Sequence, residues 1–146
     1  ENAAGEWYVT ANAIKADGTL FEEDLFGIGH FHFNTYNLSS NSIDKMWVDD
    51  NGNFWDFKGV VNLDINALKF SGDNIKNASA TGDDITFTIT NAQILKGAAK
   101  TPSGMPADSI VLDIKFSDDT YPSQYGYDRY RVEGYRYTGF VKDEYH

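Results

Sequence analysis

The chain has 146 residues, 41% of them hydrophobic and 15% aromatic, so it can bury a core and predicts one domain over residues 1–146. Its formal net charge of −10 argues against a nucleic-acid surface or an electrostatic anchor on anionic lipid, because both need clustered Lys and Arg. Cysteine is absent, which excludes disulfides and thiolate metal sites, and no apolar run approaches the ~18 residues of a membrane-spanning helix.

Alternation of apolar and polar residues predicts strands in the first part of the chain. Gly5–Ile14 forms the first, with one apolar face made of Trp7, Val9, Ala11 and Ala13. Asp17-Gly18 predicts a turn, and the acidic stretch up to Asp24 predicts an exposed connection. The second strand covers Gly27–Asn37, with Phe31, Phe33 and Thr35 on one face.

Asn51-Gly52 lies between two aromatic-rich runs and predicts a two-residue hairpin, because Asn-Gly suits turn positions that need positive φ. This turn would set Val48 opposite Trp55 and Met46 opposite Phe57. The expected apolar face is then Met46, Val48, Trp55 and Phe57, continuing to Val61 and Leu63.

The second half of the chain predicts further strands. Leu68–Gly72 is a weak one, whereas Ile85–Thr90 alternates cleanly, and a change of parity after it predicts a β-bulge near Asn91. Glycines and prolines in Lys96–Asp108 predict a long connection before the strand Ser109–Phe116. A long loop then follows from Asp118 to Asp128, and it contains Tyr121, Tyr125 and Tyr127.

The last predicted strand is Arg129–Phe140, with Arg136 on its core-facing side. About eight short strands without an amphipathic helix predict an all-β fold, either an antiparallel up-and-down barrel or a two-sheet β-sandwich. The pair Trp7 and Arg136 favours the barrel. If the first and last strands meet, the Arg136 guanidinium can lie over the Trp7 indole and close one end.

Gly5-x-Trp7 with Arg136 on the last strand resembles the signature of the calycin group, the lipocalins and their relatives. Longer runs are similar to the Bacteroidetes family labelled lipid-binding putative hydrolases: Ala4–Val9, Trp47–Lys58, Lys96–Ser109 and Gly134–Phe140. The resemblance implies a lipocalin-like barrel on an exported lipoprotein, often encoded beside glycan-uptake systems. It also implies a precursor that is lipid-anchored at the outer membrane or cell surface, whereas the 146-residue chain itself is expected to be soluble.

Two sets of residues are candidate binding sites. The first lines the barrel interior: Phe31, Phe33, Trp55, Phe57, Val61 and Phe87. Small inward residues among these large ones either leave a cavity for an apolar ligand or simply interdigitate in a filled core. The second set is a surface site for sugar or protein partners, made of the loop residues Tyr121, Tyr125 and Tyr127.

No metal, cofactor or catalytic site is predicted. His30-x-His32 has a spacing that can share a metal, but no third ligand is evident, so two surface histidines are expected. Asp49-x-Asn51-x-Asn53 resembles a calcium loop, yet Phe54 stands where that loop needs glycine. Nucleophile-elbow, zinc-protease and phosphate-loop motifs are absent from the sequence.

Three functional hypotheses follow. The leading one is a monomeric, non-catalytic barrel of the bacterial envelope that binds an apolar or amphipathic small molecule. The second is an accessory surface lipoprotein of a glycan-uptake complex in the outer membrane, binding sugar or a partner protein through the loop tyrosines. The third is a hydrolase of unknown substrate, which the family label alone suggests.

Overall fold

The computed structural model describes residues 3–38 and 43–137, which form nine strands and one short helix. In chain order these are β1 (Gly5–Ile14), β2 (Leu20–Glu22), β3 (Phe31–Asn37), β4 (Lys45–Asp49), β5 (Lys58–Asp64), β6 (Lys69–Lys76), β7 (Thr86–Lys100), β8 (Pro106–Phe116), α1 (Tyr121–Tyr125) and β9 (Arg129–Arg136). No helix among these residues is long and apolar enough to cross a membrane.

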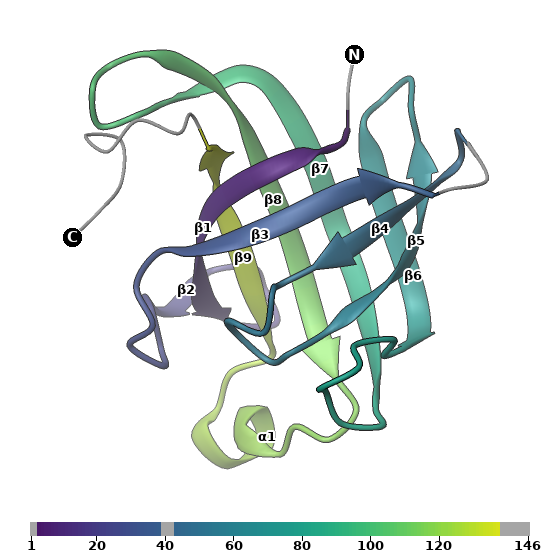
Figure 1. Ribbon diagram of the computed structural model, residues 1–146. Helices are drawn as coiled ribbons and strands as arrows, with labels where there is room; N and C mark the ends of the chain where they lie inside the picture. The colour runs from purple at the N-terminus through teal and green to yellow at the C-terminus, as the bar shows by residue number, and fades with distance from the viewer. Residues whose placement is uncertain (1–2, 39–42, 138–146) are drawn as a thin grey trace.

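Eight of the strands close into an antiparallel barrel. Each strand from β3 to β9 pairs with its predecessor in the ring, and β9 pairs back onto β1 (Figure 1). β2 stands outside this ring and pairs only with the end of β1. The up-and-down barrel predicted from the sequence is therefore confirmed, and the two-sheet sandwich is not formed.

Alternating side chains of every barrel strand form the core, as the period of two predicts. Trp7, Val9, Ala11 and Ala13 of β1 are all buried on the same face. The bulge expected near Asn91 is also present: Asn91 has a φ of 50°, and the pairing with β8 shifts between Thr90 and Gln93. The shift keeps the apolar residues that follow on the core side.

Arg136 joins the two strands that close the ring. Its register partner on β1 is Trp7, and the Arg136 Cζ atom lies 4.3 Å from the centre of the Trp7 ring. Its Nη1 atom donates a hydrogen bond to the Ala4 carbonyl at 2.9 Å, and Asp108 on β8 accepts another from Nε at 3.2 Å. A side chain at Gly5 would overlap Arg136 Nη1, which explains why glycine precedes the tryptophan by two positions.

The predicted hairpin register at Asn51-Gly52 is wrong. β4 and β5 pair Val48 with Gly59 and Met46 with Val61, so the connection is a loop of residues 50–57 and Trp55 does not face Val48. Asn51 and Gly52 do have positive φ, 55° and 75°. The pairing stops at Asp49 and Lys58 because the buried Asp50 side chain takes up the backbone N–H groups of the loop.

Other boundaries also differ from the prediction, and β3 begins at Phe31 where Gly27 was predicted. The supposed connection Lys96–Asp108 is mostly paired strand, because an irregularity between Leu95 and Ala99 lets β7 and β8 continue to a turn at residues 101–105. β6 extends to Lys76, and β2 forms inside the acidic stretch. β9 ends at Arg136, and residues 138–140 of the predicted last strand lie outside the described residues.

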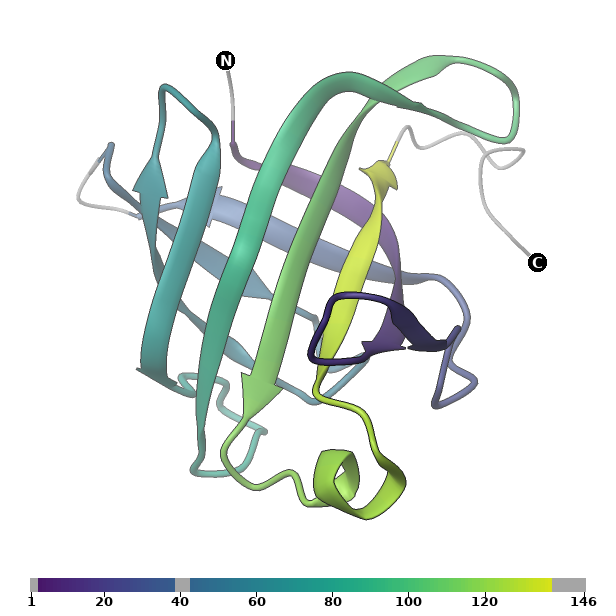
Figure 2. The same cartoon turned by 180° about the vertical axis from the view of Figure 1, so that it is seen from behind.

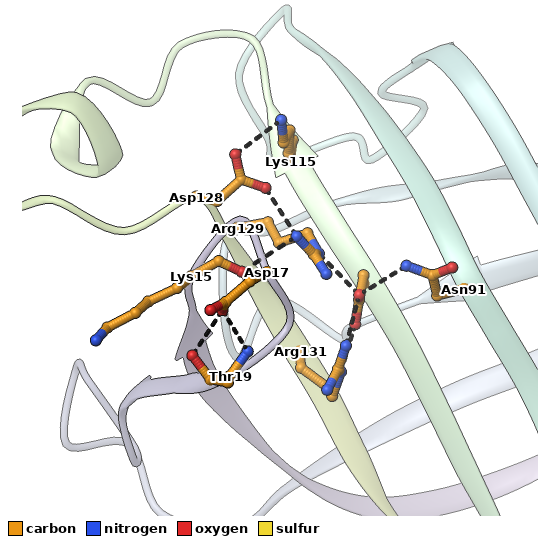
Figure 3. Close-up of polar contacts among 9 residues, drawn as sticks. Lys15, Asp17, Thr19, Asn91, Lys115, Asp128, Arg129 and Arg131 are labelled. Carbon is orange, nitrogen blue, oxygen red and sulfur yellow. Dashed lines mark hydrogen bonds and ion pairs between the residues drawn. The ribbon is translucent and has the colours of Figure 1, made fainter.

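A buried carboxylate joins the outer sides of β7, β8 and β9. Asp113 on β8 is fully buried although it faces away from the core, and Arg131 contacts both of its oxygens at 2.7 and 2.9 Å. Arg129 donates from Nε at 2.8 Å and Asn91 from its amide at 3.1 Å. Figure 3 shows Arg129, Arg131 and Asn91 converging from the strands on either side.

The closure predicts a coupling between Gly5 and Arg136. Arg136→Ala should lower the free energy of unfolding by about 0.5–2 kcal/mol or more, the range of a cation–π contact. Gly5→Ala should cost about 1–3 kcal/mol as an overpacking substitution, and less when it is combined with Arg136→Ala. Urea unfolding of the two single variants and the double variant tests this, and strictly additive costs would contradict the contact.

The Asp113 cluster predicts an acid-dependent contribution to stability. Burial opposes the charged form, but hydrogen bonds from Arg131 and Arg129 hold the pKa of Asp113 below its ordinary value. Its stabilisation is therefore present above the unfolded-state pKa of about 3.9 and is lost as the pH falls below it. Asp113→Asn should lower stability at pH 7 by about 2–3 kcal/mol.

The difference between the wild type and this variant should shrink when urea unfolding is repeated towards pH 3. Asp84→Asn, at an exposed acid in the β6–β7 loop, is the matched control and should change stability little at either pH. A constant difference across this pH range would argue against the ion pairs as the source of the effect.

Candidate functional site

A cavity opens at the end of the barrel where α1 lies. Its volume is about 510 Å³, within the range of small-molecule pockets. We call it the aromatic mouth pocket, and its lining residues are Phe21, Glu22, Leu25, Phe26, Tyr121, Tyr125 and Tyr127. They come from two segments far apart in sequence, the β2 region and the β8–β9 loop, which both views place at the same end of the barrel (Figure 2).

The short helix α1 positions one wall of the pocket. Proline in its first turn suits helix initiation, and Gly126 ends it with a φ of 87° and an N–H bonded to the Pro122 carbonyl at 2.9 Å. Tyr121 and Tyr125 are four residues apart and therefore share a helix face, with ring centroids 6.0 Å apart. They are 44% and 64% exposed, so they form the rim.

The β2 region supplies the other wall. Phe21 lies 5.2 Å from the Tyr127 ring and Phe26 lies 6.0 Å from the Tyr121 ring, measured between centroids. The turn that carries Phe26 is fixed by Asp24, whose carboxylate accepts the N–H groups of Ile28 and Gly29. Apolar side chains thus reach across from an acidic segment to the tyrosines of the α1 loop.

Beneath the pocket lies an aromatic floor made of Phe54, Trp55, Phe116 and Tyr130. Trp55 stacks on Phe116 with centroids 4.4 Å apart, and its Nε1 donates to Asp118 at 3.0 Å. Phe26 lies 5.5 Å from Tyr130 and 6.0 Å from Trp55, so the pocket wall rests on this floor.

Asp50 holds the loop that contributes half of this floor. Its carboxylate is buried and accepts five backbone N–H bonds of 2.8–3.2 Å, from Gly52, Phe54, Trp55, Asp56 and Phe57. Burial raises the pKa of Asp50, whereas the five donors favour the charged form. One carboxylate therefore holds the backbone that carries Phe54 and Trp55.

A chain of hydroxyl groups runs through the pocket wall into the core. The Tyr130 hydroxyl donates to the Asp119 carboxylate, and the Tyr127 and Tyr130 oxygens are 2.7 Å apart. Asp119 is oriented in turn by the Tyr121 N–H at 3.0 Å. Burial, together with these contacts, raises the pKa of Tyr130 far above its ordinary value, and burial also raises the pKa of Tyr127. Both phenols therefore keep their hydrogens at neutral pH.

The structure separates the residues predicted as one interior site. Phe31, Phe33, Phe57, Val61 and Phe87 are buried in the core, where the Phe57 ring lies 5.0 Å from Phe87 and 6.1 Å from Phe33. Trp55 lies instead in the loop at the barrel end. That these six residues bind a ligand stays a prediction.

The three loop tyrosines do come together, because all of them line the aromatic mouth pocket. Sequence reasoning missed the residues that face them, Phe21, Leu25 and Phe26. The signal available was apolar pairs, Leu20-Phe21 and Leu25-Phe26, inside a stretch that its acids marked as exposed.

Other features of the described residues support a binding site less well. A hollow of about 580 Å³ lies on the outer wall of β7, β8 and β9, but charged side chains such as Arg131 and Glu133 contribute to its lining. His32 pairs with Glu6 at 2.7 Å, and within the described ranges no three His, Asp or Glu side chains are grouped to hold a metal. His146 lies outside the described residues.

The fold places the protein among closed antiparallel barrels of eight strands, a class that includes proteins which hold one small ligand. A family model described as "lipid-binding putative hydrolase" matches residues 1–141, so the chain belongs to this family. A lipid-binding role fits both the family and the barrel fold. No curated protein matches the sequence significantly.

Asp50→Asn should disorganise the floor of the pocket. Asparagine keeps one acceptor but turns an NH₂ group towards backbone donors, which leaves buried N–H groups unpaired. We expect the free energy of unfolding to fall by about 1–3 kcal/mol and the fluorescence of Trp55 to shift to longer wavelength. Asp84→Asn, at an exposed acid outside this loop, is the control. Equal stabilities of wild type and Asp50→Asn would contradict the assigned role of Asp50.

Proposed function

We propose that this protein binds an apolar or amphipathic, lipid-like molecule in the aromatic mouth pocket, without catalysing its conversion. The observation that carries the proposal is the pocket itself, in which six of the seven lining residues are apolar or aromatic. Membership of a lipid-binding family supports the same ligand class.

The physical basis of such binding is the removal of apolar surface from water. Each buried CH₂ group of a ligand contributes about 0.8 kcal/mol, and aromatic walls supply rigid contact area. Phe21, Leu25 and Phe26 offer this on one side. On the other, Tyr121 and Tyr125 present apolar ring faces with hydroxyl tips, which suit a ligand that has both apolar and polar parts.

Binding of an uncharged apolar fluorophore, N-phenylnaphthylamine, tests the site. Phe26→Ala and Tyr125→Ala should each weaken its binding about tenfold, since each removes an aromatic contact worth about 1.4 kcal/mol with its buried area. Tyr125 is the more exposed of the two rim tyrosines, so its variant should keep the stability of the wild type.

Ile43→Ala is the matched control, because it shortens an apolar side chain that is 75% exposed at the opposite end of the barrel. Unchanged affinity in both pocket variants would rule out the aromatic mouth pocket. If truncation of Val61 in the core abolished binding instead, the interior site predicted from the sequence would be preferred.

We also propose that the protein belongs to the bacterial envelope and has an exported, lipid-anchored precursor, which only the resemblance to the Bacteroidetes family supports. Two alternative functions are compatible with that location. A sugar-binding or accessory role in glycan uptake is favoured by the exposed rim tyrosines, and Tyr125-dependent retention on a glycan array would support it. A hydrolase would release product from generic ester substrates, and activity above that of heat-denatured protein would overturn the non-catalytic part of the proposal.

A further inference from the structure

We infer that the ligand of the aromatic mouth pocket has a hydrogen-bond-donating head without negative charge, such as a hydroxyl or an amine, and that ionised fatty acids are excluded. The inference rests on the proposed function and specifies the ligand class for the same pocket. Three features of the pocket carry it: the direction of the tyrosine chain, the free carboxylate of Glu22, and the placement of the nearby bases.

The tyrosine chain in the wall has a fixed direction. A phenol carries one hydrogen, and Tyr130 donates its own to the Asp119 carboxylate. The contact of 2.7 Å between the Tyr127 and Tyr130 oxygens must then use the hydrogen of Tyr127. The remaining capacity of the Tyr127 oxygen is to accept, so a hydrogen bond between it and an occupant requires a donor on the occupant.

Glu22 adds a second acceptor, which is also negatively charged. It lines the pocket from β2 as an exposed residue, so water contacts its carboxylate, and no group within residues 3–38 and 43–137 pairs with it. An ammonium or hydroxyl group on a ligand would replace that water as a donor. A carboxylate beside Glu22 would instead place two like charges together, which opposes binding.

The bases near α1 are already engaged elsewhere. Lys115 and Arg129 line a separate hollow of about 200 Å³, where Lys115 lies 3.4 Å from Asp128. Arg129 contacts Asp113 and Asp128 at 2.8 and 2.9 Å, as Figure 3 shows for Asp128. Among the described residues, those lining the aromatic mouth pocket include one acid and no Lys or Arg.

Within the described lining, the donors left for an anionic head are the hydroxyls of Tyr121 and Tyr125, which water also contacts because both residues are exposed. These hydroxyls can donate to a carboxylate but supply no positive charge to offset the water that it loses on binding. The chain's net charge of −10 adds a long-range repulsion of anions. The pocket therefore discriminates between ligands by the chemistry of the ligand's head group, whereas its apolar walls accept any apolar chain.

Three amphiphiles with the same saturated dodecyl-length chain test the inference: monolauroylglycerol, dodecylamine and laurate. Each is titrated below its critical micelle concentration at pH 8, by displacement of N-phenylnaphthylamine from the full chain. We expect the glycerol ester and the amine to bind on the order of tenfold or more tightly than laurate, as for a buried acceptor that meets no donor.

Two variants identify the groups responsible. Glu22→Gln should weaken dodecylamine binding severalfold and leave monolauroylglycerol nearly unchanged, because only the charge is removed. Tyr130→Phe keeps the ring but frees the Tyr127 hydrogen to face the pocket, and should raise the affinity for laurate relative to the glycerol ester. Thermal unfolding verifies that both variants remain folded at the assay temperature.

The outcomes separate this inference from the proposed function. Equal affinity for all three amphiphiles, sensitive to Phe26→Ala, would overturn the head-group selectivity while the proposed binding site stands. Binding of none of the three would overturn both. Preference for laurate would overturn the inference and indicate that a cation reaches the pocket.

Discussion

Closure of the ring between β1 and β9 is the constraint on which the rest of the structure depends. An open sheet of eight strands would leave two edges, and its inward residues would have no common centre to fill. Arg136 fixes the closure by lying over Trp7 while contacting Ala4 and Asp108, so one side chain joins β1, β8 and β9. The core aromatics then meet one another, and the loops at the far end are brought within reach of each other.

Buried or half-buried carboxylates organise those loops. Asp50, Asp24 and Asp119 each accept backbone N–H groups from the segment that follows them in the chain. Much of the acid in this sequence therefore satisfies backbone donors that a turn would otherwise leave unpaired. On the outer wall of the barrel, the Asp113 carboxylate accepts hydrogen bonds from two arginines in a comparable way. A high negative charge is thus compatible with ordered loops, because several of the carboxylates accept hydrogen bonds from the protein itself.

Most of the barrel could be predicted because its signals are local and repetitive: alternation in β1 and β3 and the parity change at Asn91 show in residue spacing. The pair Trp7 and Arg136 is not local. It could be predicted because the two residues lie on the core-facing sides of the first and last strands, which a closed barrel must bring together. The register after residue 50 could not be predicted. The tight turn at Asn51-Gly52 does form, since the Asn53 N–H bonds to the Asp50 carbonyl at 2.9 Å. The five N–H bonds that the Asp50 carboxylate accepts from residues 52–57 then prevent strand pairing directly beyond the turn, and no sequence pattern indicates these bonds.

Only one wall of the aromatic mouth pocket could be predicted from the sequence, for a related reason. Tyr121, Tyr125 and Tyr127 lie close in sequence, so their grouping follows from composition, but their partners Phe21 and Phe26 come from a segment about a hundred residues earlier, as their numbers in the sequence show. Only the closed ring brings β2 beside the β8–β9 loop. The direction of the Tyr127, Tyr130 and Asp119 chain likewise needs the atoms, because sequence cannot say which hydroxyl donates.

The two ends of the barrel have different roles as a result. At one end Trp7 is completely buried beneath Arg136 and donates its indole N–H to Thr35, so polar groups there are used within the protein. At the other end, rings lie exposed around a cavity and Glu22 has no partner among the described residues. Exposed apolar surface beside polar groups is what a ligand pocket offers. The geometry that closes the ring at Trp7 therefore leaves the α1 end as the place where we propose that a ligand binds.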